Sequence, residues 1–167
     1  MNSKKLLCLA VLCIGLAMGS LTGCRSNKQV SSAFSSFNFQ PAYVSSGADG
    51  NLVVRSWGTG STKAEAVREA MKNAVNAVVF KGLSGCDSYQ CQALVTEVNA
   101  RQRYADYFDR FFATGGEYQK FVKEASKSDA SRIESKSDSR QNYSVVVNVD
   151  RNSLRRQLTD DGIISPR

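Results

Sequence analysis

The side chains best suited to chemistry in this chain are its cysteines and carboxylates, because the sequence contains no histidine. Ser-His and Cys-His nucleophile pairs and His-based metal cages are therefore excluded. Two pairs of neighbouring acids remain, Asp106 with Asp109 and Asp160 with Asp161, and paired carboxylates can cleave glycosidic bonds. Both pairs fall on predicted helix surfaces or in a terminal turn beside Arg and Lys. We interpret them as solvated or capping residues and expect no enzyme; the alternative is a carboxylate-dependent hydrolase that acts on glycan.

Residues 1–23 have the three parts of an export signal. Two lysines stand near the start, an apolar run covers residues 6–18, and small residues precede position 24. A transmembrane helix needs about 20 apolar residues, and several small or polar residues interrupt this run. An uncleaved anchor and an ordinary secretory signal are the alternatives. Cys24 directly after Leu21-Thr22-Gly23 argues against both, because an ordinary cleavage site does not need a cysteine there.

The segment Leu21-Thr22-Gly23-Cys24 resembles the lipobox of bacterial lipoproteins. The resemblance implies that the Cys24 thiol receives a diacylglyceryl group, that the chain is cleaved before it, and that the new amino group is acylated. Several acyl chains on one residue meet the requirement for stable anchoring, which takes more than one chain. Arg25 follows, in place of the Asp that resembles an inner-membrane retention signal in enteric bacteria. We expect a lipid-anchored protein of the bacterial cell envelope, in the outer membrane, with Cys24 as its lipidation site.

Two of the five cysteines form the only pair outside the N-terminal segment. Cys8 and Cys13 lie in the apolar run, which leaves Cys86 and Cys91 for the folded part. In an oxidising compartment such a pair is expected to form a disulfide. Its short loop contributes about 2 kcal/mol on the chain-entropy estimate. A zinc site would require further thiolates or imidazoles, so we expect no metal and no other cofactor.

Length and composition predict one soluble domain after the export segment. The chain has 167 residues, of which 42% are hydrophobic and 22% charged, values near those of ordinary globular proteins. Its net charge is +7, but Lys and Arg are dispersed and often stand beside an acid, as in Asp109-Arg110 and Asp150-Arg151. Scattered charge of this kind is typical of a solvated surface. We therefore expect no nucleic-acid partner.

The composition divides the exported part into a tether and a domain. Residues 24–50 are rich in Ser, Asn, Gln and Gly, which is typical of a tether. Four aromatic residues interrupt it and allow part of it to fold back: Phe34, Phe37, Phe39 and Tyr43. The domain is expected to cover residues 51–164. It opens with a β-branched strand over residues 52–57, followed by a turn at Gly58-Thr59-Gly60.

An Ala-rich helix follows this turn. Thr62 with Glu65 three residues later forms a capping box, and Gly82 is expected to end the helix. Apolar residues at spacings of three and four predict one buried face. The face comprises Ala64, Val67, Met71, Ala74 and Val78, widened by Ala66, Ala70 and Ala77. Small side chains permit close approach to a sheet.

A second helix is predicted over residues 92–113, ending at Gly115-Gly116. Leu94, Val98, Ala105, Phe108 and Phe112 share one side of it, and Tyr104, Tyr107 and Phe111 flank them. We interpret this aromatic band as core, with a ligand shelf as the alternative.

The last third of the chain predicts strands and a short helix. A helical turn is favoured slightly over a strand around Tyr118, an exposed strand covers residues 131–137, and the strongest strand covers residues 141–150. Asp150 or Asn152 is expected to cap a final short helix. The order predicts an α+β fold: a small, largely antiparallel sheet packed by the Ala-rich helix and the aromatic second helix.

Two segments resemble the LPP20-like lipoproteins and the related amino-terminal domain of a flagellar-motor assembly protein. Ser56-Trp57-Gly58-Thr59-Gly60, followed by the Ala-rich stretch at residues 63–70, is similar to the family's Gly-containing turn and helix. The stretch at residues 142–149, followed by Leu154, is similar to its closing strand and helix. The family implies an envelope lipoprotein with a structural or assembly role and no catalytic residue. Cys86 and Cys91 and the aromatic second helix depart from its pattern.

We therefore expect a membrane-anchored binding, structural or assembly module with an envelope protein as its partner. Its candidate partner surface is the corner at the end of the first strand, with Trp57 and Thr59, or the exposed rings of the second helix, with Tyr104 and Tyr107. For Trp57, the single tryptophan, the alternative is a packing residue of the core.

Overall fold

A computed structural model describes residues 39–47, 49–125, 131–133 and 141–166 of the chain. All of them belong to one compact unit. The export segment, Cys24, Phe34 and Phe37 lie outside the described residues, as does the part of the predicted strand at residues 134–137.

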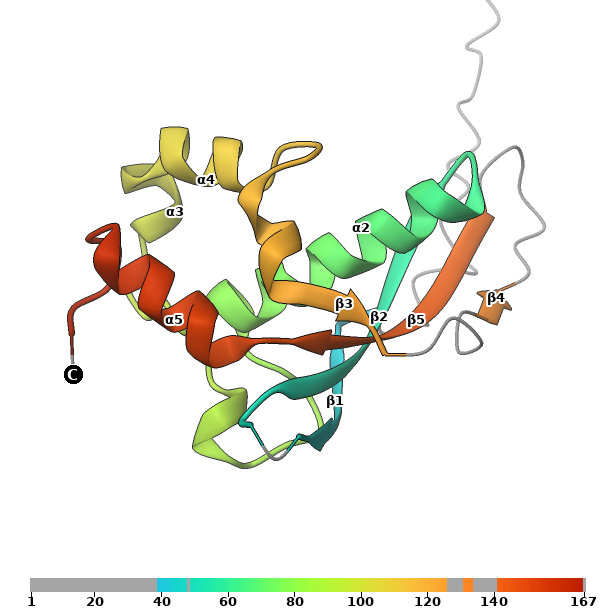
Figure 1. Ribbon diagram of the computed structural model, residues 1–167, viewed down its shortest axis with the longest axis horizontal. Helices are drawn as coiled ribbons and strands as arrows, with labels where there is room; N and C mark the ends of the chain where they lie inside the picture. The colour runs from blue at the N-terminus through green and yellow to red at the C-terminus, as the bar shows by residue number, and fades with distance from the viewer. Residues whose placement is uncertain (1–38, 48, 126–130, 134–140, 167) are drawn as a thin grey trace, which may run out of the picture. The chain divides into compact units, whose positions relative to one another are not determined.

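The domain is α+β and its sheet is antiparallel, as predicted (Figure 1). Within the described residues its strands are β1 (Ala42–Ser46), β2 (Leu52–Gly60), β3 (Val122–Glu124), β4 (Ser131–Ile133) and β5 (Gln141–Val149). They run in the order β1-β2-β5-β3, and β4 pairs with β5 on the same edge as β3. β3 lies opposite residues 147–149 of β5, and β4 lies opposite residues 142–144. The long pair β2 and β5 is the centre of the sheet.

The sheet begins earlier than the sequence predicts. β1 lies within the expected tether of residues 24–50, yet it pairs with β2, with Ala42 opposite Arg55. Contacts with other parts of the domain hold it there as well. The Tyr43 amide donates to the Ser84 carbonyl at 2.9 Å, and the Tyr43 ring packs against the core. The aromatic residues at this end of the tether are therefore part of the domain.

The Ala-rich helix α2 (Lys63–Asn76) begins at the predicted capping box. The Glu65 amide donates to Thr62 Oγ1 at 3.2 Å, and Glu65 Oε2 accepts from the Thr62 amide at 3.3 Å. The helix continues into a π-helical turn, η1 (Ala77–Lys81), and ends at Gly82, whose φ of 78° suits glycine. Its buried face includes Ala66, Ala70 and Ala74, whereas Ala64 is exposed, contrary to the prediction.

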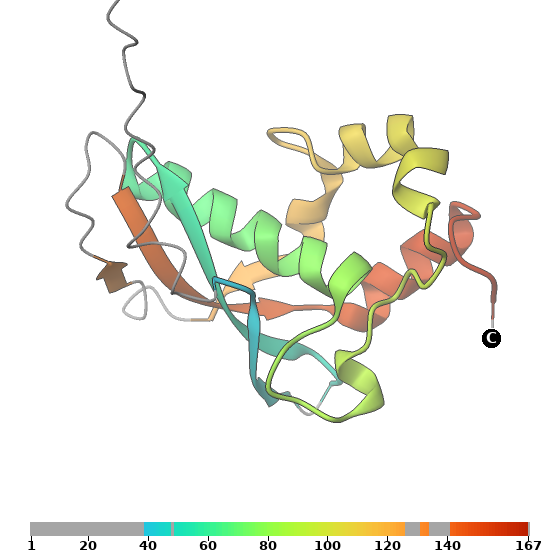
Figure 2. The same ribbon diagram turned by 180° about the vertical axis from the view of Figure 1, so that it is seen from behind.

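Gly58 and Gly60 do not form the predicted turn, because β2 continues through both of them. Their role is to let α2 approach the strand. A β-carbon on Gly58 would overlap backbone atoms of Ala66 and Ala70, and one on Gly60 would crowd Glu65 and Ala66. The missing side chains thus bring α2 onto β2 and β5, and Figure 2 shows α2 along this face.

The prediction of one continuous second helix over residues 92–113 is wrong. A short η2 turn (Tyr89–Cys91) is followed by non-helical chain to Asn99, then by α3 (Ala100–Arg103) and α4 (Ala105–Phe111). The Leu94 and Val95 amides donate to the carbonyls of Val78 and Val79 in η1, at 3.0 and 2.9 Å. Gln92 has an extended backbone, with φ −71° and ψ 151°. The two hydrogen bonds satisfy carbonyls at the end of the first helix and hold the chain after Gln92 against it in a non-helical course. Val98, predicted to be on the buried side, is 94% exposed.

The aromatic band forms a buried cluster, as predicted. Phe108, Phe111 and Phe112 of α4 are nearly inaccessible to solvent. Phe80 lies edge-on to Phe108 with 4.7 Å between ring centroids, and Phe121 stacks on Phe111 at 6.0 Å. These rings join α4 to η1 and to η3 (Glu117–Phe121), the turn that leads into β3. The segment around Tyr118 is thus a helical turn followed by a short strand.

The last helix, α5 (Arg151–Asp160), follows β5 directly and is capped by Asp150, one of the two predicted caps. Asp150 Oδ1 accepts from the Ser153 amide at 2.9 Å. Leu154 and Leu158 are fully buried, and Gly162 ends the helical segment with a φ of 70°. The final helix therefore agrees with the sequence in its cap, its buried face and its end.

Candidate functional site

The candidate residues Trp57 and Thr59 lie on the face of the sheet opposite α2. Side chains alternate along β2, and Leu52, Val54 and Ser56 are fully buried on the α2 side. The outer face, as we name the opposite face, carries the residues between them and their partners in the register with β5. It comprises Val53, Arg55, Trp57 and Thr59 of β2 and Asn142, Ser144, Val146 and Asn148 of β5.

Trp57 is half-buried and is no member of the buried core. The Phe39 ring lies edge-on to it, with 6.3 Å between centroids and an interplanar angle of 76°. The backbone around it is fixed from the other side, because Asn73 Nδ2 in α2 donates to the Trp57 carbonyl at 2.9 Å. Thr59 is exposed and its hydroxyl donates to Asn142 Oδ1. Trp57 thus presents part of its ring on a rigid strand.

Tyr104 and Tyr107 lie elsewhere, at the start of α4 and within it. The two alternative surfaces therefore lie on different elements, β2 and α4. Tyr104 is half-buried beneath the Arg103 guanidinium, 5.3 Å from its ring centroid. Tyr107 is half-buried, stacks on Phe111 and points toward the end of α5. We treat the outer face and the α4 surface as two separate candidates.

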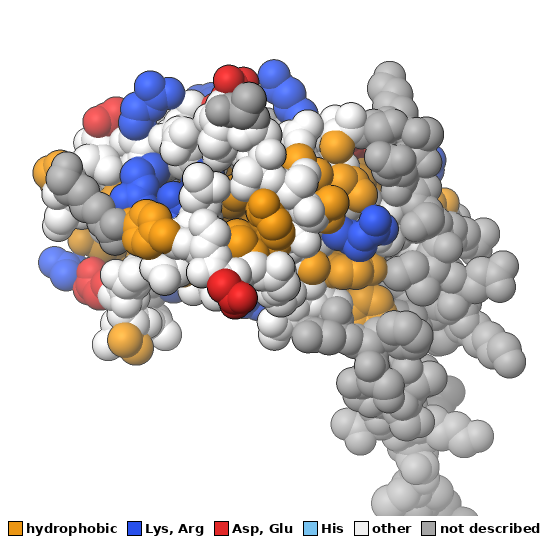
Figure 3. Space-filling model, turned by 90° about the horizontal axis from the view of Figure 1, so that it is seen from below, with side chains coloured by type: hydrophobic (Ala, Val, Ile, Leu, Met, Phe, Trp, Pro, Cys, Tyr) orange, Lys and Arg blue, Asp and Glu red, His pale blue; other side chains and the backbone are white. Residues whose placement is uncertain are grey.

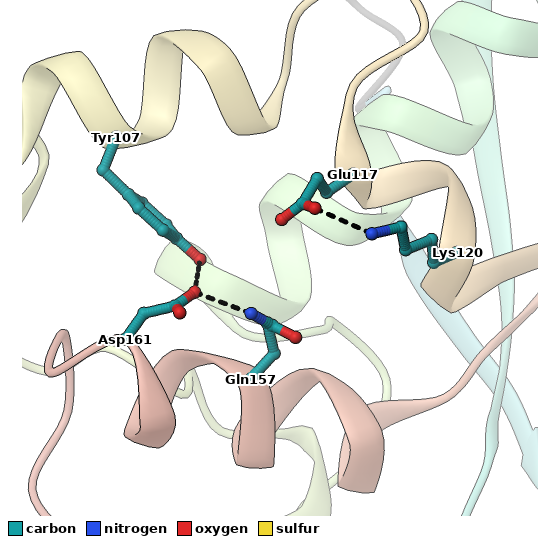
Figure 4. A network of polar contacts seen from close by, with 5 residues as sticks. All are labelled: Tyr107, Glu117, Lys120, Gln157 and Asp161. Carbon is teal, nitrogen blue, oxygen red and sulfur yellow. Dashed lines mark hydrogen bonds and ion pairs between the residues drawn. The ribbon is translucent and has the colours of Figure 1, made fainter.

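Tyr107 closes a polar network between α4 and α5 (Figure 4). Its hydroxyl donates to Asp161 Oδ2 at 2.6 Å, and Gln157 Nε2 donates to the same oxygen at 2.9 Å. Burial raises the pKa of Tyr107, and the hydrogen bond to Asp161 and the nearby carboxylate charges raise it further. The hydroxyl therefore stays protonated near neutral pH, where it acts as a donor that ties the two helices together.

The carboxylate pairs considered for glycan hydrolysis lie at the surface. Asp106 and Asp109 are exposed on α4, and Asp160 is exposed in the last turn of α5. Asp161 accepts from Tyr107 and Gln157, so its nearest described contacts are structural. In the described part of the chain, no group of three or more Cys, Asp and Glu is placed to hold a metal ion.

A disulfide joins Cys86, in the loop after η1, to Cys91, the last residue of η2, and we name residues 82–92 the disulfide loop. This loop contacts both ends of the domain. Ser46 Oγ in β1 donates to Gln90 Oε1 at 3.1 Å, and the Tyr89 ring lies 5.7 Å from the Arg151 guanidinium of α5. The disulfide thus stabilises a loop that joins the first strand to the last helix.

Arg151 is a buried residue that the sequence reasoning missed. The Asp150-Arg151 pair predicts a solvated charge, but Arg151 is 5% exposed and Arg151 Nη2 donates to the Gln92 carbonyl at 3.2 Å. Burial, together with the charge of Arg155, lowers the pKa of Arg151. Its position in the first turn of α5 does not indicate burial, because the residues that cover it, Tyr89 and Gln92, come from the disulfide loop.

Comparison with protein-family models, with curated proteins and with solved structures finds no match to this chain. Within the part that the structure describes, none of the helices is long and apolar enough to cross a membrane.

Proposed function

We propose that this protein is a lipid-anchored, non-catalytic module of the bacterial envelope, placed in the outer membrane by acylated Cys24, with an envelope protein as its partner. The observation that carries the proposal is the segment Leu21-Thr22-Gly23-Cys24 at the end of an apolar run. The likeness of two segments to LPP20-like lipoproteins supports the same class of structural or assembly component. The disulfide between Cys86 and Cys91 adds support, since such bonds persist in oxidising compartments.

The arrangement of the domain favours binding over catalysis. Asp106 and Asp109 are exposed on α4, and Asp161 is engaged by Tyr107 and Gln157. By contrast, a half-buried Trp57 on a rigid strand is a feature of binding surfaces, because an indole supplies a large contact area at low entropic cost. A lipid anchor also raises the effective concentration of the domain near envelope partners.

Metabolic labelling with a fatty-acid analogue tests the anchor. We expect the wild-type protein to be labelled and to fractionate with membranes, and Cys24→Ala to be unlabelled and released. The double variant Cys86→Ser/Cys91→Ser is the matched control, because it removes two thiols and keeps Cys24; it should be labelled as the wild type is. An unlabelled, freely soluble wild-type protein would contradict the anchor.

Photo-crosslinking in living cells tests the partner. A photoreactive side chain is placed at Thr59, on the outer face, or at Tyr104, at the α4 surface. We expect an adduct with one envelope protein of defined mass from at least one position, and its loss in the Cys24→Ala background. Hydrolysis of glycan by the soluble domain alone would support the enzyme instead, and the acids Asp106 and Asp160 would then be substituted first.

A further inference from the structure

On the outer face, the described strands carry cations and no carboxylate. Strands β1, β2 and β5 contain no Asp or Glu, and Arg55 of β2 is exposed on this face. In β3, Lys123 lies opposite Asn148 and therefore shares the outer face, whereas Glu124 lies opposite Val147 on the α2 side. Asp49 lies beyond the strands, in the turn between β1 and β2. The described strands thus present a positive surface, although charge is scattered elsewhere.

Apolar and aromatic side chains lie between these cations. Trp57 and Val53 are half-buried in the same strand as Arg55, and Phe39 lies against Trp57. Figure 3 views the molecule from below, the side opposite α2, and shows hydrophobic side chains gathered together, with Lys, Arg and acidic side chains near them. Tryptophan, with an apolar ring and one N–H donor, favours the boundary between water and the apolar region of a bilayer.

The sequence limits how far this face can be from a membrane. Residues 25–38 separate Cys24 from Phe39, the first described residue. Fully extended, they span at most about 50 Å. Phe39 contacts Trp57, so the chain from the proposed anchor enters the domain beside the outer face. The proposed anchor therefore keeps the outer face close to the bilayer, which raises the effective concentration of this face at the lipid surface.

We infer that the outer face docks on an anionic bilayer surface, with Arg55 and Lys123 facing lipid phosphates and Trp57 at the interface. This inference extends the proposed function, which supplies the nearby membrane. The charge complementarity and the single tryptophan beside the cations favour a bilayer over a second protein. Anionic lipid attracts each Lys or Arg near the surface strongly enough to change binding about fivefold. Salt screens this attraction, so docking weakens as ionic strength rises.

The test uses residues 24–167 with Cys24→Ala, which contain the whole compact unit and carry no acyl chain. The docking and the lipid anchor can therefore fail separately. Trp57 is the only tryptophan, so its emission reports on this face alone. With mixed phosphatidylcholine–phosphatidylglycerol vesicles, we expect a blue shift and quenching by brominated lipid. With phosphatidylcholine vesicles, we expect neither.

Charge substitutions supply the matched comparison. Arg55→Gln and Lys123→Gln should each weaken binding to the anionic vesicles about fivefold. Arg68→Gln, an exposed arginine of α2, removes the same charge from the opposite side and should leave binding unchanged. Equal weakening by Arg68→Gln would overturn the inference, because it would mean attraction by net charge alone. An unshifted Trp57 emission would also overturn it, as would a shift caused by soluble anionic glycan but not by vesicles.

Discussion

The Ala66 carbonyl in α2 occupies the space that a β-carbon on Gly58 in β2 would need. The same β-carbon would overlap the Ala70 amide nitrogen. These are backbone atoms within a helix, and they cannot move aside as the end of a flexible side chain can. The separation between α2 and the sheet is therefore set by the absence of a side chain at residue 58.

Gly58→Ala should lower the free energy of unfolding by about 3 kcal/mol, the upper range for overpacking a core. Gly47→Ala is the matched control, because its β-carbon would meet its nearest atoms in Asn51 at an ordinary 3.7 Å. Urea unfolding of both variants measures the difference. Equal midpoints would mean that α2 does not lie this close to β2.

The sequence predicted the elements whose signals are local. The capping box of Thr62 and Glu65, the cap at Asp150 and the alternation of β5 each act within a few residues. The prediction of one continuous second helix was wrong because the Leu94 and Val95 amides donate to carbonyls of η1. Residue spacing does not reveal this tertiary contact. The glycines of β2 were read as a turn for a related reason, because a close approach is visible only when the packed helix is known.

The strand corner and the helix rings were predicted as alternative surfaces, and the structure places them apart. The Trp57 side chain lies on the face of β2 that points away from α2, whereas the Tyr107 side chain points toward α5. One small partner therefore cannot contact both residues. Which face of β2 receives α2 depends on the packing of the Ala-rich helix, and a single strand does not specify it. Arg151 was misread because its cover, Tyr89, lies in a loop far away in the sequence.

The disulfide predicts a second stability difference. Cys86→Ser/Cys91→Ser should lose about 2 kcal/mol, because the unfolded chain regains the freedom of the short loop. Reductant should lower the unfolding midpoint of the wild type toward that of the variant and leave the variant unchanged. Mass spectrometry of the exported protein gives the independent check, and two free thiols at Cys86 and Cys91 would refute the bond.

Asp150 predicts a loss of stability in acid. Burial favours its protonated form, but hydrogen bonds from Ser153 and the charge of Arg156 outweigh burial and lower the pKa of the carboxyl below its ordinary 3.8. A lowered pKa contributes stability above the unfolded-state value, and this stability disappears as the pH falls through the folded-state value. Asp150→Ala should cost about 1 kcal/mol at neutral pH, as lost helix caps do.

The difference between the wild type and Asp150→Ala should shrink as the pH falls below about 4, where the wild-type carboxylate takes up its proton. Thermal unfolding from pH 7 to pH 2 measures it. Asp87→Ala, an exposed loop acid, is the control and should have little effect throughout. A difference that stays constant down to pH 2 would show that the cap does not depend on the charge.

The raised pKa of Tyr107 predicts the opposite pH dependence of stability, with a loss at high pH. Its pKa is raised by burial and by the bond to Asp161, so the folded protein holds the phenolic proton more tightly than the unfolded chain. A raised pKa contributes stability below the unfolded value of 10, and this stability is lost as the pH rises above it. Tyr107→Phe should cost about 1 kcal/mol at neutral pH, the usual worth of one hydrogen bond.

Above pH 10 the wild type should lose this advantage over Tyr107→Phe, and spectrophotometric titration should show that Tyr107 ionises late. Tyr104→Phe is the control, since the described contact of Tyr104 is to its ring, beneath Arg103. The late-ionising group should be missing from Tyr107→Phe and present in Tyr104→Phe. If both variants kept it, another tyrosine would be the buried donor, and the link between α4 and α5 would have to depend on the aromatic cluster alone.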